Sequence, residues 1–477
     1  MGKEQELNAD IAIIGAGGAG LPAAVTAAYG GASVIVFEKM AAIGGAANMA
    51  EGIFAVESNI QRRENVGLTK DQAFKLHMEY SHWRVNPSLV RVIIDRSAET
   101  IEWLMAQGAK ICEPRALYPD SLRTWHTLEG YGKTITKALY EKAKEAGVQV
   151  LLKTPAKKLV LDEEGRISGV IAEDKNGNTI KANVKAVIIS DGGFGNNMEM
   201  LQKYTNAGPD IIHYGGKGPN GDGIQMAWEI GAAAEGTDVL QRGMPMVRGE
   251  MGITRLNTLL SQPYLWVNQW GERFFDEGTY EFPFVGNAIA KQANQIMYII
   301  FDDHTKKYMK EVGIDFGAGV YVPIATKLDN IDAELQRGID KGEAYVAETI
   351  DQLASMIDIN GEKLVATVEK YNGFCSKGHD DQFAKNPKFL HPVKTPEFYA
   401  IRACPTLVGT VGGIKINSKT EVLNKKDVAI PGLYASGNCA GGMYGDTYDA
   451  VTSGLTISFA VSSGRIGSEN ALRYIGK

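Results

Sequence analysis

The chain has 477 residues, long enough for roughly two or three domains with hydrophobic cores of their own. Hydrophobic residues make up 44% and charged residues 22%, as in ordinary globular proteins, and the net charge of −6 gives no general attraction to nucleic acid or to an anionic membrane surface. No apolar run is long enough to span a membrane, and the polar first ten residues do not resemble a signal peptide.

The four cysteines show no spacing typical of a metal or haem site. They form no C-x-x-C pair, no zinc-ligand pattern and no C-x-x-C-H haem motif: Cys112, Cys375, Cys404 and Cys439. We therefore expect free thiols in a reducing cytoplasm, no metal ion and no haem of the protein's own.

Residues 11–39 have the pattern of a dinucleotide-binding unit. An apolar run at 11–14 leads into a glycine-rich turn, an alanine-rich helical segment follows, and a second apolar run at 33–37 ends at Glu38. This order predicts strand, turn, helix and strand, with an acidic residue at the tip of the second strand.

The glycines of this turn have distinct physical roles in such a site. Gly15 permits the tight turn, Gly17 lets the backbone approach a pyrophosphate, and Gly20 allows helix and strand to pack closely. The helix N-terminus offers free N–H groups to the phosphates. Glu38 can accept hydrogen bonds from a ribose diol and would repel the extra phosphate of NADP. We therefore predict a bound dinucleotide.

Two later segments are predicted to be loops. A second glycine pair within residues 40–52 indicates a loop laid against a flat ligand. Residues 111–132, with two prolines and an aromatic cluster, are expected to be irregular, and Tyr118 and His126 are weak candidates for reaching a site.

Helices are expected at residues 69–81 and 87–107, the second with Pro87 at its first helical position. We interpret this pair as scaffold. His77 and His82 are expected to be surface residues of it and not ligands.

The following pattern is helix, three short strands joined by hairpin turns, and a buried strand. These elements are expected at residues 134–146, 157–161, 167–172, 179–183 and 186–189. Asp222 lies where a loop becomes a helix at 224–230, so it is either a ligand contact or only an N-terminal cap.

The character of the chain changes at about residue 240, where aromatic residues and prolines replace the glycine turns, and mostly helical segments are expected to about 378. Glycine turns and strands return from about 396, and a helix is expected at 455–472. This predicts one nucleotide-binding domain interrupted by an insertion.

Motifs across nearly the whole chain resemble those of flavoproteins of the fumarate reductase/succinate dehydrogenase type, which include soluble flavocytochrome-like reductases, urocanate reductase and the 3-ketosteroid dehydrogenases. The motifs are IIGAGGAG…EK, GGAAN, SDGGFG, GDGIQMA, VNQWGERFFDE, GTVGGIKIN and IPGLYASGN. The resemblance implies an α/β fold with a Rossmann-like FAD-binding domain, residues 1–240 and 386–477, and an inserted α+β clamp domain, 241–385, that covers the substrate.

The resemblance also implies FAD as the tightly held cofactor. The GGAAN loop contains no histidine, the residue that links FAD covalently in the respiratory enzymes, so we expect non-covalent FAD. The last helix is implied to point its N-terminus at the flavin pyrimidine, where its dipole would stabilise the anionic reduced flavin. The residues assigned to FAD are Gly15, Gly17, Gly18, Ala19, Gly20, Glu38, Lys39, Gly44, Gly45, Ala46, Ala47, Asn48, Gly52, Ala156, Asp191, Gly192, Asp222, Gly437, Asn438, Gly454, Leu455, Thr456 and Ile457.

The charged residues with which this family holds a dicarboxylate have no counterpart here. Such enzymes bind carboxylates through His and Arg side chains. The family's H-P-T appears as residues 243–245 (GMP), its H-T-M-G-G as 409–413 (GTVGG), and its T-T-R-D as 279–282 (TYEF). The arginine of N-R-L-G-G-N falls on Tyr448. We therefore do not expect fumarate or succinate as the substrate.

The polar candidates that remain are tyrosines. Hydride transfer between flavin N5 and an alkene conjugated to a carbonyl needs a donor for the developing enolate oxygen and an acid or base for the α-proton. We assign the first role to Tyr448 and the second to Tyr280, with Glu281 beside it. Arg255 and Tyr264 are reserves. The alternative for each tyrosine is ordinary packing of its ring.

The leading hypothesis is an FAD-dependent ene-reductase or dehydrogenase acting on a CH–CH bond next to a carbonyl, in a fairly apolar ketone, enone or aromatic-type acid. The alternatives are a fumarate-reductase-like enoate reductase, an aspartate-oxidase-like FAD oxidase, and a flavin electron-transfer subunit without a substrate of its own. Because the chain has no haem motif, its electrons would be exchanged with a diffusible carrier or a partner redox protein.

Overall fold

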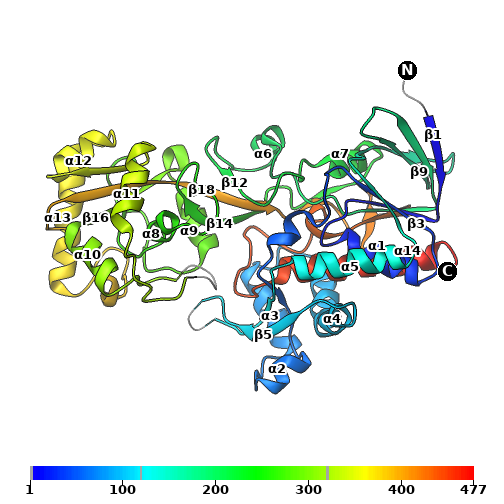
Figure 1. Cartoon of the computed structure of the whole chain (residues 1–477), viewed down its shortest axis with the longest axis horizontal. Helices are drawn as coiled ribbons and strands as arrows, with labels where there is room; N and C mark the ends of the chain where they lie inside the picture. The colour runs from blue at the N-terminus through cyan, green and yellow to red at the C-terminus, as the bar shows by residue number, and fades with distance from the viewer. Residues whose placement is uncertain (1–3, 119–120, 318–321) are drawn as a thin grey trace. The chain divides into compact units, whose positions relative to one another are not determined.

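The computed structural model describes residues 4–118, 121–317 and 322–477. The chain divides into two units, each with its own core. Unit 1 comprises Met1–Thr205, Gly215–Gln241 and Gly409–Lys477, and unit 2 comprises Asn206–Tyr214 and Arg242–Val408. The first strand, β1, and the last helix, α14, both belong to unit 1 (Figure 1).

Unit 1 is built around a six-stranded sheet in the order β20-β21-β11-β2-β3-β7. The strands from β21 to β7 run parallel, and β20 pairs antiparallel at one edge. The central strands β2 and β11 contain only buried alanine, isoleucine and valine, as expected for strands covered on both faces. The strands are β2 Ile11–Ile14, β3 Val34–Glu38, β7 Gln149–Leu152, β11 Ala186–Ile189, β20 Glu421–Leu423 and β21 Ala429–Ala435.

The chain reverses its order across this sheet at β2. From β2 the chain passes through helix α1 (Gly20–Tyr29) to β3, which lies on one side of β2. Strand β11, on the other side of β2, begins about 150 residues after the end of β3. In open parallel sheets, ligands bind in the crevice at such a switch point, beyond the carboxyl ends of the strands. The glycine turn after β2 lies at this place.

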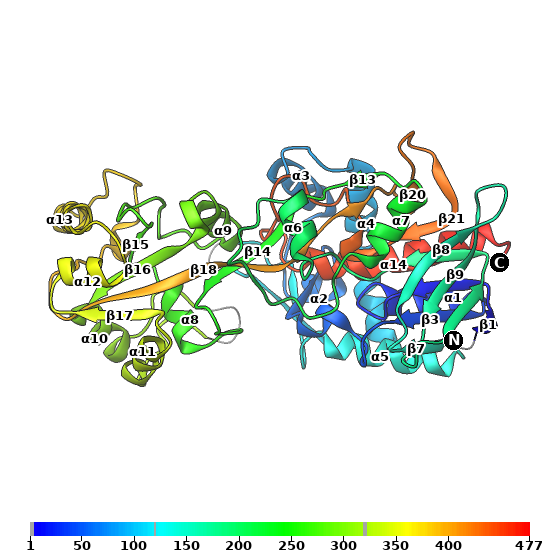
Figure 2. The ribbon, with the colours of Figure 1, turned by 90° about the horizontal axis from the view of Figure 1, so that it is seen from above.

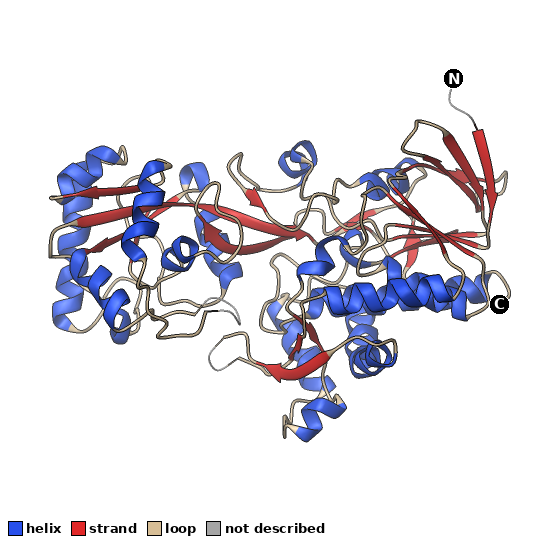
Figure 3. Ribbon diagram, viewed as in Figure 1, coloured by secondary structure: helices blue, strands red, loops and turns tan. Residues whose placement is uncertain are grey.

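Two layers cover the sheet of unit 1. Helix α1 packs against both α5 (Lys133–Glu145) and α14 (Leu455–Tyr474) along one face (Figure 3). A four-stranded sheet, β1-β10-β9-β8, lies against the other face through β9. Its strands are β1 Glu4–Asn8, β8 Ala156–Leu161, β9 Ile167–Glu173 and β10 Thr179–Asn183.

The segment expected to be irregular at 111–132 instead contains two strands, so that expectation is wrong. Strands β4 (Gly52–Phe54), β6 (Trp125–Leu128) and β5 (Ile111–Arg115) form a small antiparallel sheet in that order. Pro114 is tolerated because β5 is an edge strand. Residues 119–120 of this segment lie outside the described residues.

The expected helices of unit 1 are confirmed, with ends that differ by one or two residues. Asp222 is not the N-cap of its helix: Gly221, with φ of +77°, takes that position, and Asp222 is the first helical residue. The remaining elements of this unit are α2 Asn59–Arg63, α3 Lys70–Tyr80, α4 Pro87–Ala106, α6 Met198–Tyr204, α7 Asp222–Glu229, the 3₁₀ turns η1 Gly45–Met49 and η4 Gly437–Cys439, and the short pair β13 Ala234–Glu235 with β19 Gly413–Ile414.

Unit 2 is centred on the long strand β18, which pairs with β12, β14, β16 and β17 (Figure 2). Between residues 240 and 378 most of the described elements are helices, as expected, and the strands that lie between them in the sequence belong to this sheet. The elements are β12 Ile212–His213, β14 Leu240–Met246, α8 Arg255–Leu260, β15 Leu265–Val267, α9 Phe282–Ala290, η2 Ala293–Gln295, β16 Met297–Asp302, α10 Asp303–Glu311, α11 Ile331–Asp340, β17 Ala344–Ala347, α12 Ile350–Met356, α13 Gly361–Lys377, η3 Pro387–Phe389 and β18 Phe398–Thr410.

The sheet of unit 2 is buried on both faces, each by a separate cluster. In β16, Ile299 and Phe301 face the cluster formed with α8, α9, α10 and α11, whereas Tyr298 and Ile300 face the cluster formed with α12 and α13. The two-residue period of a strand thus supplies both cores. Among the helices of the described residues, none has both the length and the apolarity to cross a bilayer.

In unit 1, α14 crosses the start of α1 at a contact that only glycine allows. A Cβ atom added to Gly464 would lie 2.2 Å from the carbonyl oxygen of Ala19, a backbone atom that cannot move aside. Gly464 and its helix neighbours are buried. This contact sets the distance between the two helices.

We predict that Gly464→Ala lowers the free energy of unfolding by roughly 1–3 kcal/mol, the usual cost of overpacking a core. The matched control is Gly373→Ala on the exposed face of α13, where a Cβ meets nothing within 4 Å. The control should be stabilised by about 1 kcal/mol, the difference in helix propensity. Calorimetric unfolding of both variants checks this, and a Gly464→Ala protein at least as stable as the wild type would contradict the packing.

Candidate functional site

The glycine turn of unit 1 is held tightly except at one position. Gly15 has φ of +102°, and a Cβ at Gly20 would lie 1.8 Å from the Gly15 oxygen. At Gly17, in contrast, a Cβ would meet only the Gly44 oxygen, at 3.8 Å. The turn therefore leaves room beside Gly17, the position predicted to face a pyrophosphate. Within the described part of the chain no side-chain hydrogen bond caps the N-terminus of α1, although the Leu21 N–H is bonded to the Gly17 oxygen and Pro22 has no N–H. The positive end of the helix dipole is therefore open to an anion.

The acidic residue at the tip of β3 is buried beside this turn. Glu38 is 8% exposed, and its two carboxylate oxygens accept hydrogen bonds from the N–H groups of Ala16, at 2.8 Å, and Met40, at 2.7 Å. Each oxygen keeps a second lone pair for a ribose hydroxyl. Ala156, also assigned to FAD, is buried at the start of β8.

Three more predicted residues meet at the start of α7. Lys39 Nζ forms an ion pair with Asp222, 2.5 Å from its Oδ2 atom. Asp191, which follows β11, accepts a 2.7 Å hydrogen bond from the N–H of Gly223. Its other oxygen, Oδ1, is buried and has no hydrogen-bond partner in the described part of the chain. This oxygen is available to a ligand hydroxyl or amide. Gly192, the residue after Asp191, has φ of +81°.

Burial raises the pKa of Asp191 to about 7, and the nearby Asp222 carboxylate acts in the same direction, while the Gly223 N–H and the Lys39 charge oppose it. Asp191 is thus largely a neutral acid below pH 7. In that form it can donate a hydrogen bond and does not repel a phosphate.

The second glycine pair forms the 3₁₀ turn η1, which packs on the first turn. The N–H of Gly44 donates to the Ala16 oxygen at 2.7 Å. A Cβ at Gly132 would lie 1.7 Å from the Ala47 oxygen, and the Thr136 hydroxyl donates to Asn48 Oδ1 at 2.6 Å. Helix α5, which carries Gly132 at its N-cap, therefore fixes the shape of η1. Gly45 and Ala46 belong to the same turn, and Gly52 begins β4 beneath Trp125.

The N-terminus of α14 lies beside η1 and the glycine turn. A Cβ at Gly18 would meet both the Ala47 Cβ, at 2.7 Å, and the Ile457 Cδ1, at 3.0 Å. Gly454, with φ of +85°, is the N-cap of α14, and its oxygen accepts the N–H of Phe54 at 3.0 Å. No side chain caps this helix end. Leu455 is fully buried in the first turn.

The residues after β21 close the same region. Gly437 has φ of +69°, its N–H donates to the Ser463 hydroxyl at 3.0 Å, and a Cβ there would lie 3.0 Å from the Ala19 Cβ. Asn438 is partly exposed in η4, and its backbone carbonyl oxygen accepts a hydrogen bond from the N–H of Gly412. Unit 1 thus brings the glycine turn, η1, η4 and the start of α14 together, although they are far apart in sequence.

Two tyrosines and a threonine form a chain of hydroxyl groups at the N-terminus of α14. Thr456 Oγ1 donates to Tyr448 Oη at 2.9 Å, and Tyr444 Oη lies 3.1 Å from Thr456 Oγ1. Because Thr456 donates to Tyr448, Tyr444 must donate to Thr456, so the hydroxyl dipoles run toward Tyr448. The Gln241 side chain also hydrogen-bonds Tyr448. Burial raises the pKa of Tyr448 to about 12, so it keeps its proton at neutral pH.

Both tyrosines belong to the segment 443–449, which we call the tyrosine loop. Their ring centroids are 5.1 Å apart, and both rings are buried. His77 of α3 contacts both ends of this loop and has no exposed surface. The expectation that His77 is a surface residue is therefore wrong, because its ring packs under the loop. His82 is exposed, as expected.

The candidates in unit 2 occupy different environments. Tyr280 is half-buried, with its ring stacked on Phe316 at a centroid distance of 3.9 Å. Glu281 is the N-cap of α9, but its side chain makes no capping hydrogen bond. Arg255 is exposed at the start of α8. Tyr264 is buried, and burial raises its pKa well above the usual value, so this reserve is a core residue.

The space next to Gly243, where the family carries a histidine, is filled by hydroxyl groups of unit 2. A Cβ at Gly243 would lie 2.3 Å from Tyr214 Oη and 2.7 Å from Thr406 Oγ1. Thr406 in turn donates to the Met244 oxygen at 2.8 Å. Two neutral hydroxyls therefore lie nearest to this position, and the residue directly before it is the buried Arg242.

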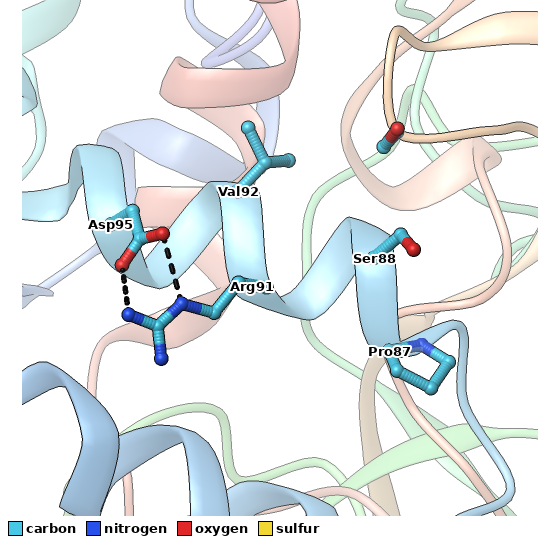
Figure 4. A pocket seen from close by; sticks show the side chains of 6 residues that line it. Pro87, Ser88, Arg91, Val92 and Asp95 are labelled. Atoms are coloured by element: carbon cyan, nitrogen blue, oxygen red, sulfur yellow. Dashed lines mark hydrogen bonds and ion pairs between the residues drawn. The ribbon is translucent and has the colours of Figure 1, made fainter.

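Two other features of unit 1 do not point to a site. His126 is buried in β6, hydrogen-bonded to Ser58 Oγ at 2.8 Å, and burial lowers its pKa to about 4, so it is a neutral core residue. A hollow of about 400 Å³ lies beside α4 (Figure 4). Its Arg91 is already paired with Asp95 and Asp71, and the hollow shares no lining residue with the glycine turn, η1, η4 or α14.

The raised pKa of Asp191 makes a testable contribution to stability. The unfolded chain loses this proton near pH 4 and the folded chain near pH 7, so unfolding becomes easier as the pH rises through this window. We predict that Asp191→Asn makes the midpoint of thermal unfolding of the ligand-free protein less dependent on pH between 4 and 7, and raises it relative to the wild type above pH 7. Parallel pH profiles for the two proteins would contradict the burial of this carboxyl group.

Comparison with known proteins agrees with this geometry. Residues 10–455 match the family described as FAD binding domain. The vinyl phenol reductase of Lactiplantibacillus plantarum is 34% identical over 484 residues, covering 98% of this chain and 96% of that protein. The open conformation of a flavocytochrome c3 fumarate reductase superposes with a TM-score of 0.76 at 27% identity, covering 99% of this chain and 79% of the other. The 3-ketosteroid delta1-dehydrogenase of Sterolibacterium denitrificans shares the fold, with a TM-score of 0.80 at 19% identity over 98% of this chain and 99% of the other.

The residues of unit 1 also fit FAD physically. The turn leaves room for a pyrophosphate at Gly17, two uncapped helix N-termini adjoin it, and the Asp191 Oδ1 atom is buried without a partner among the described residues. The chain therefore belongs to the FAD-binding family of flavoproteins that includes the fumarate reductases and 3-ketosteroid dehydrogenases, and it is an FAD-dependent oxidoreductase that acts on CH–CH bonds.

Proposed function

We propose that the protein reduces an alkene conjugated with an oxygen atom in a fairly apolar substrate, with Tyr448 as the hydrogen-bond donor to that oxygen. The observation that carries the proposal is the hydroxyl chain Tyr444–Thr456–Tyr448 at the uncapped N-terminus of α14. FAD bound in unit 1 supplies or accepts the hydride.

The chain's own residues prepare Tyr448 for this role. Its oxygen accepts the hydrogen bond from Thr456, and the Gln241 side chain also stabilises the charged form of this oxygen. Hydrogen bonds of this kind polarise the phenol and strengthen its own O–H as a donor. Because the ring is buried, the donor acts in a medium of low dielectric constant, where stabilising a developing negative charge has its largest effect.

This role fits two related substrate types. In an enone, hydride addition at the β-carbon places negative charge on the carbonyl oxygen. In vinyl phenol, the alkene is conjugated through the ring with the phenol oxygen. Protonation of its terminal carbon with loss of the phenol proton gives a quinone methide, and hydride addition at the benzylic carbon returns the charge to that oxygen. Either oxygen needs one neutral donor, and a tyrosine supplies it.

We assign the accompanying proton transfer to Tyr280, assisted by Glu281. Both are partly exposed in unit 2, and the Glu281 carboxylate is not used to cap α9. Unit 2 would then be the clamp domain that covers the substrate, and unit 1 the FAD domain. The exposed Arg255 remains a reserve for a charged substrate group.

A fumarate-like substrate is disfavoured by the groups at Gly243. The hydroxyls of Tyr214 and Thr406 occupy the adjoining space, and neither can form the bidentate, charge-assisted pair that a carboxylate prefers. An oxidase and an electron-transfer subunit remain alternatives that the substrate test separates. We further propose non-covalent FAD, because no histidine occurs in η1, and a cytoplasmic location, because all four cysteines are free thiols. The electron donor or acceptor would be an external carrier or redox protein.

We predict that, in the absence of oxygen, the photoreduced protein is reoxidised by 4-vinylphenol or a cyclic enone at least ~10-fold faster than by fumarate. A neutral hydrogen-bond donor does not stabilise the two negative charges of a bound dicarboxylate. Flavin absorbance measures the rate, and acid precipitation before the assay checks that FAD is released. Reoxidation by fumarate alone would favour the enoate reductase. Rapid reoxidation by oxygen, with formation of peroxide, would favour the oxidase. Reoxidation only by a redox protein would favour the electron-transfer subunit. Each of these three results would contradict the proposal.

We predict that Tyr448→Phe retains FAD but lowers kcat at least ~100-fold, the lower edge for loss of an oxyanion donor. Tyr434→Phe is the matched control, because Tyr434 is also buried in unit 1 but lies in β21. The control should keep near-wild-type turnover per bound flavin. Wild-type turnover in Tyr448→Phe would remove this residue from the mechanism.

A further inference from the structure

One histidine side chain ties together the two ends of the tyrosine loop. His77 Nδ1 lies 2.8 Å from Asp449 Oδ2, and Nε2 lies 2.8 Å from the carbonyl oxygen of Met443. Tyr444 and Tyr448 are the residues directly inside these two contacts. Neither His77 nor Asp449 has any exposed surface. The imidazole and the Tyr444 ring also meet edge to face, with their centroids 5.8 Å apart.

The hydrogen bonds around Asp449 show which groups donate. Its Oδ1 accepts the N–H groups of Val451, at 2.7 Å, and Thr452, at 3.1 Å, and its Oδ2 accepts the Thr452 hydroxyl at 2.6 Å. A carboxyl group surrounded by donors is satisfied as the carboxylate. His77 Nε2 faces a carbonyl oxygen, which can only accept, so Nε2 carries a proton, and one further proton lies between Nδ1 and Asp449 Oδ2.

The contact between His77 and Asp449 is placed to hold the tyrosine loop in one conformation. A buried pair of polar side chains contributes little net stability, because the loss of hydration offsets the attraction between its members. The tyrosine loop contains neither helix nor strand, and glycines precede and interrupt it, so its own backbone does not hold the tyrosine hydroxyls in place. A catalytic donor must be held to within about 0.5 Å of its productive position.

We propose that His77 and Asp449 are positioning residues, whose buried, hydrogen-bonded side chains hold the tyrosine loop so that the Tyr448 hydroxyl meets Thr456 at the N-terminus of α14. In this proposal the pair acts on the reaction through Tyr448. This inference rests on the proposed role of Tyr448. The anchor is α3, which the sequence presents as plain scaffold, and it joins residues 372 positions apart in the chain.

The test is a double-mutant cycle between Asp449→Asn and Tyr448→Phe, with kcat expressed per acid-released FAD. We predict that Asp449→Asn alone lowers kcat at least ~10-fold, because the lost alignment matters in the transition state. In the Tyr448→Phe background, the same change should cost less than ~2-fold, because the donor it positions is already gone. Equal costs in the two backgrounds would overturn the inference.

His77→Gln provides a second variant if Asp449→Asn does not fold. An amide can donate to Asp449 but cannot donate to the Met443 oxygen at the same time, so we predict a smaller loss, about 3- to 10-fold in kcat. The matched control is His82→Gln, because His82 pairs with Asp446 of the same loop at 3.2 Å but is exposed. The control should keep wild-type kcat. A purely structural role predicts instead a lower unfolding midpoint with unchanged kcat per flavin in both His77 and Asp449 variants.

A binding measurement gives a readout independent of turnover. The affinity of the oxidised, FAD-loaded protein for 4-ethylphenol, followed by perturbation of the flavin spectrum, should fall at least ~5-fold in Asp449→Asn and not at all in His82→Gln. Unchanged affinity together with unchanged kcat would overturn the inference. If Tyr448→Phe itself costs nothing, the proposed function fails first, whereas a 100-fold loss in Tyr448→Phe with no loss in Asp449→Asn and His77→Gln refutes only the positioning role.

Discussion

Close backbone contact between α1 and α14 is the constraint on which the rest of unit 1 depends. At Gly18 and Gly464 a single methyl group would collide with the opposite element, and at Gly464 the collision is with backbone. The absence of side chains lets the glycine turn, η1 and the first turn of α14 share one small volume. Two helix N-termini, each uncapped by a side chain, therefore adjoin the same place. An extended dinucleotide needs this combination, because both its phosphates and its reduced ring system carry negative charge.

The same contact fixes the position of the hydroxyl groups to which we assign the substrate chemistry. Thr456 lies in the first turn of α14, so the row of hydroxyl groups that ends at Tyr448 is built on the helix that adjoins the residues predicted to hold FAD. These hydroxyl groups are neutral, the two tyrosine rings are buried, and the O–H groups of Tyr444 and Thr456 point toward Tyr448. They suit an oxygen that becomes negative during the reaction and suit poorly one that is already a carboxylate. The hydroxyl groups beside Gly243 extend this preference to unit 2.

The local parts of the fold could be predicted from the sequence because their signals are local. The glycine turn, the acidic end of β3 and the capped helices each occupy fewer than about 30 residues, and the physical reason for each residue is visible in its neighbours. The short strands at 111–115 and 125–128 were not predictable, because Pro114 masks an edge strand. Asp222 was ambiguous because a carboxylate at the start of a helix serves as well in a cap as in an ion pair, and only the position of Lys39 decides between them.

Long-range partners account for the rest. His77 has the sequence context of a surface residue of an amphipathic helix. No neighbouring residue in the sequence indicates that its side chain is buried against Asp449. Likewise, the partners of Asp191 come from α7, and its burial follows from packing that no local pattern encodes. Buried polar groups must find partners, but the sequence does not say which. Residue roles in the tyrosine loop therefore follow from the fold and not from the motifs that identify the family.

The most direct test of the account is a crystal structure of the FAD-loaded protein with 4-ethylphenol bound. The account predicts that the phenol oxygen lies about 2.5–3.0 Å from Tyr448 Oη, the distance of an O–H···O hydrogen bond, with Tyr448 still bonded to Thr456. A phenol oxygen held by a histidine or arginine side chain, with Tyr448 out of hydrogen-bond reach, would contradict it.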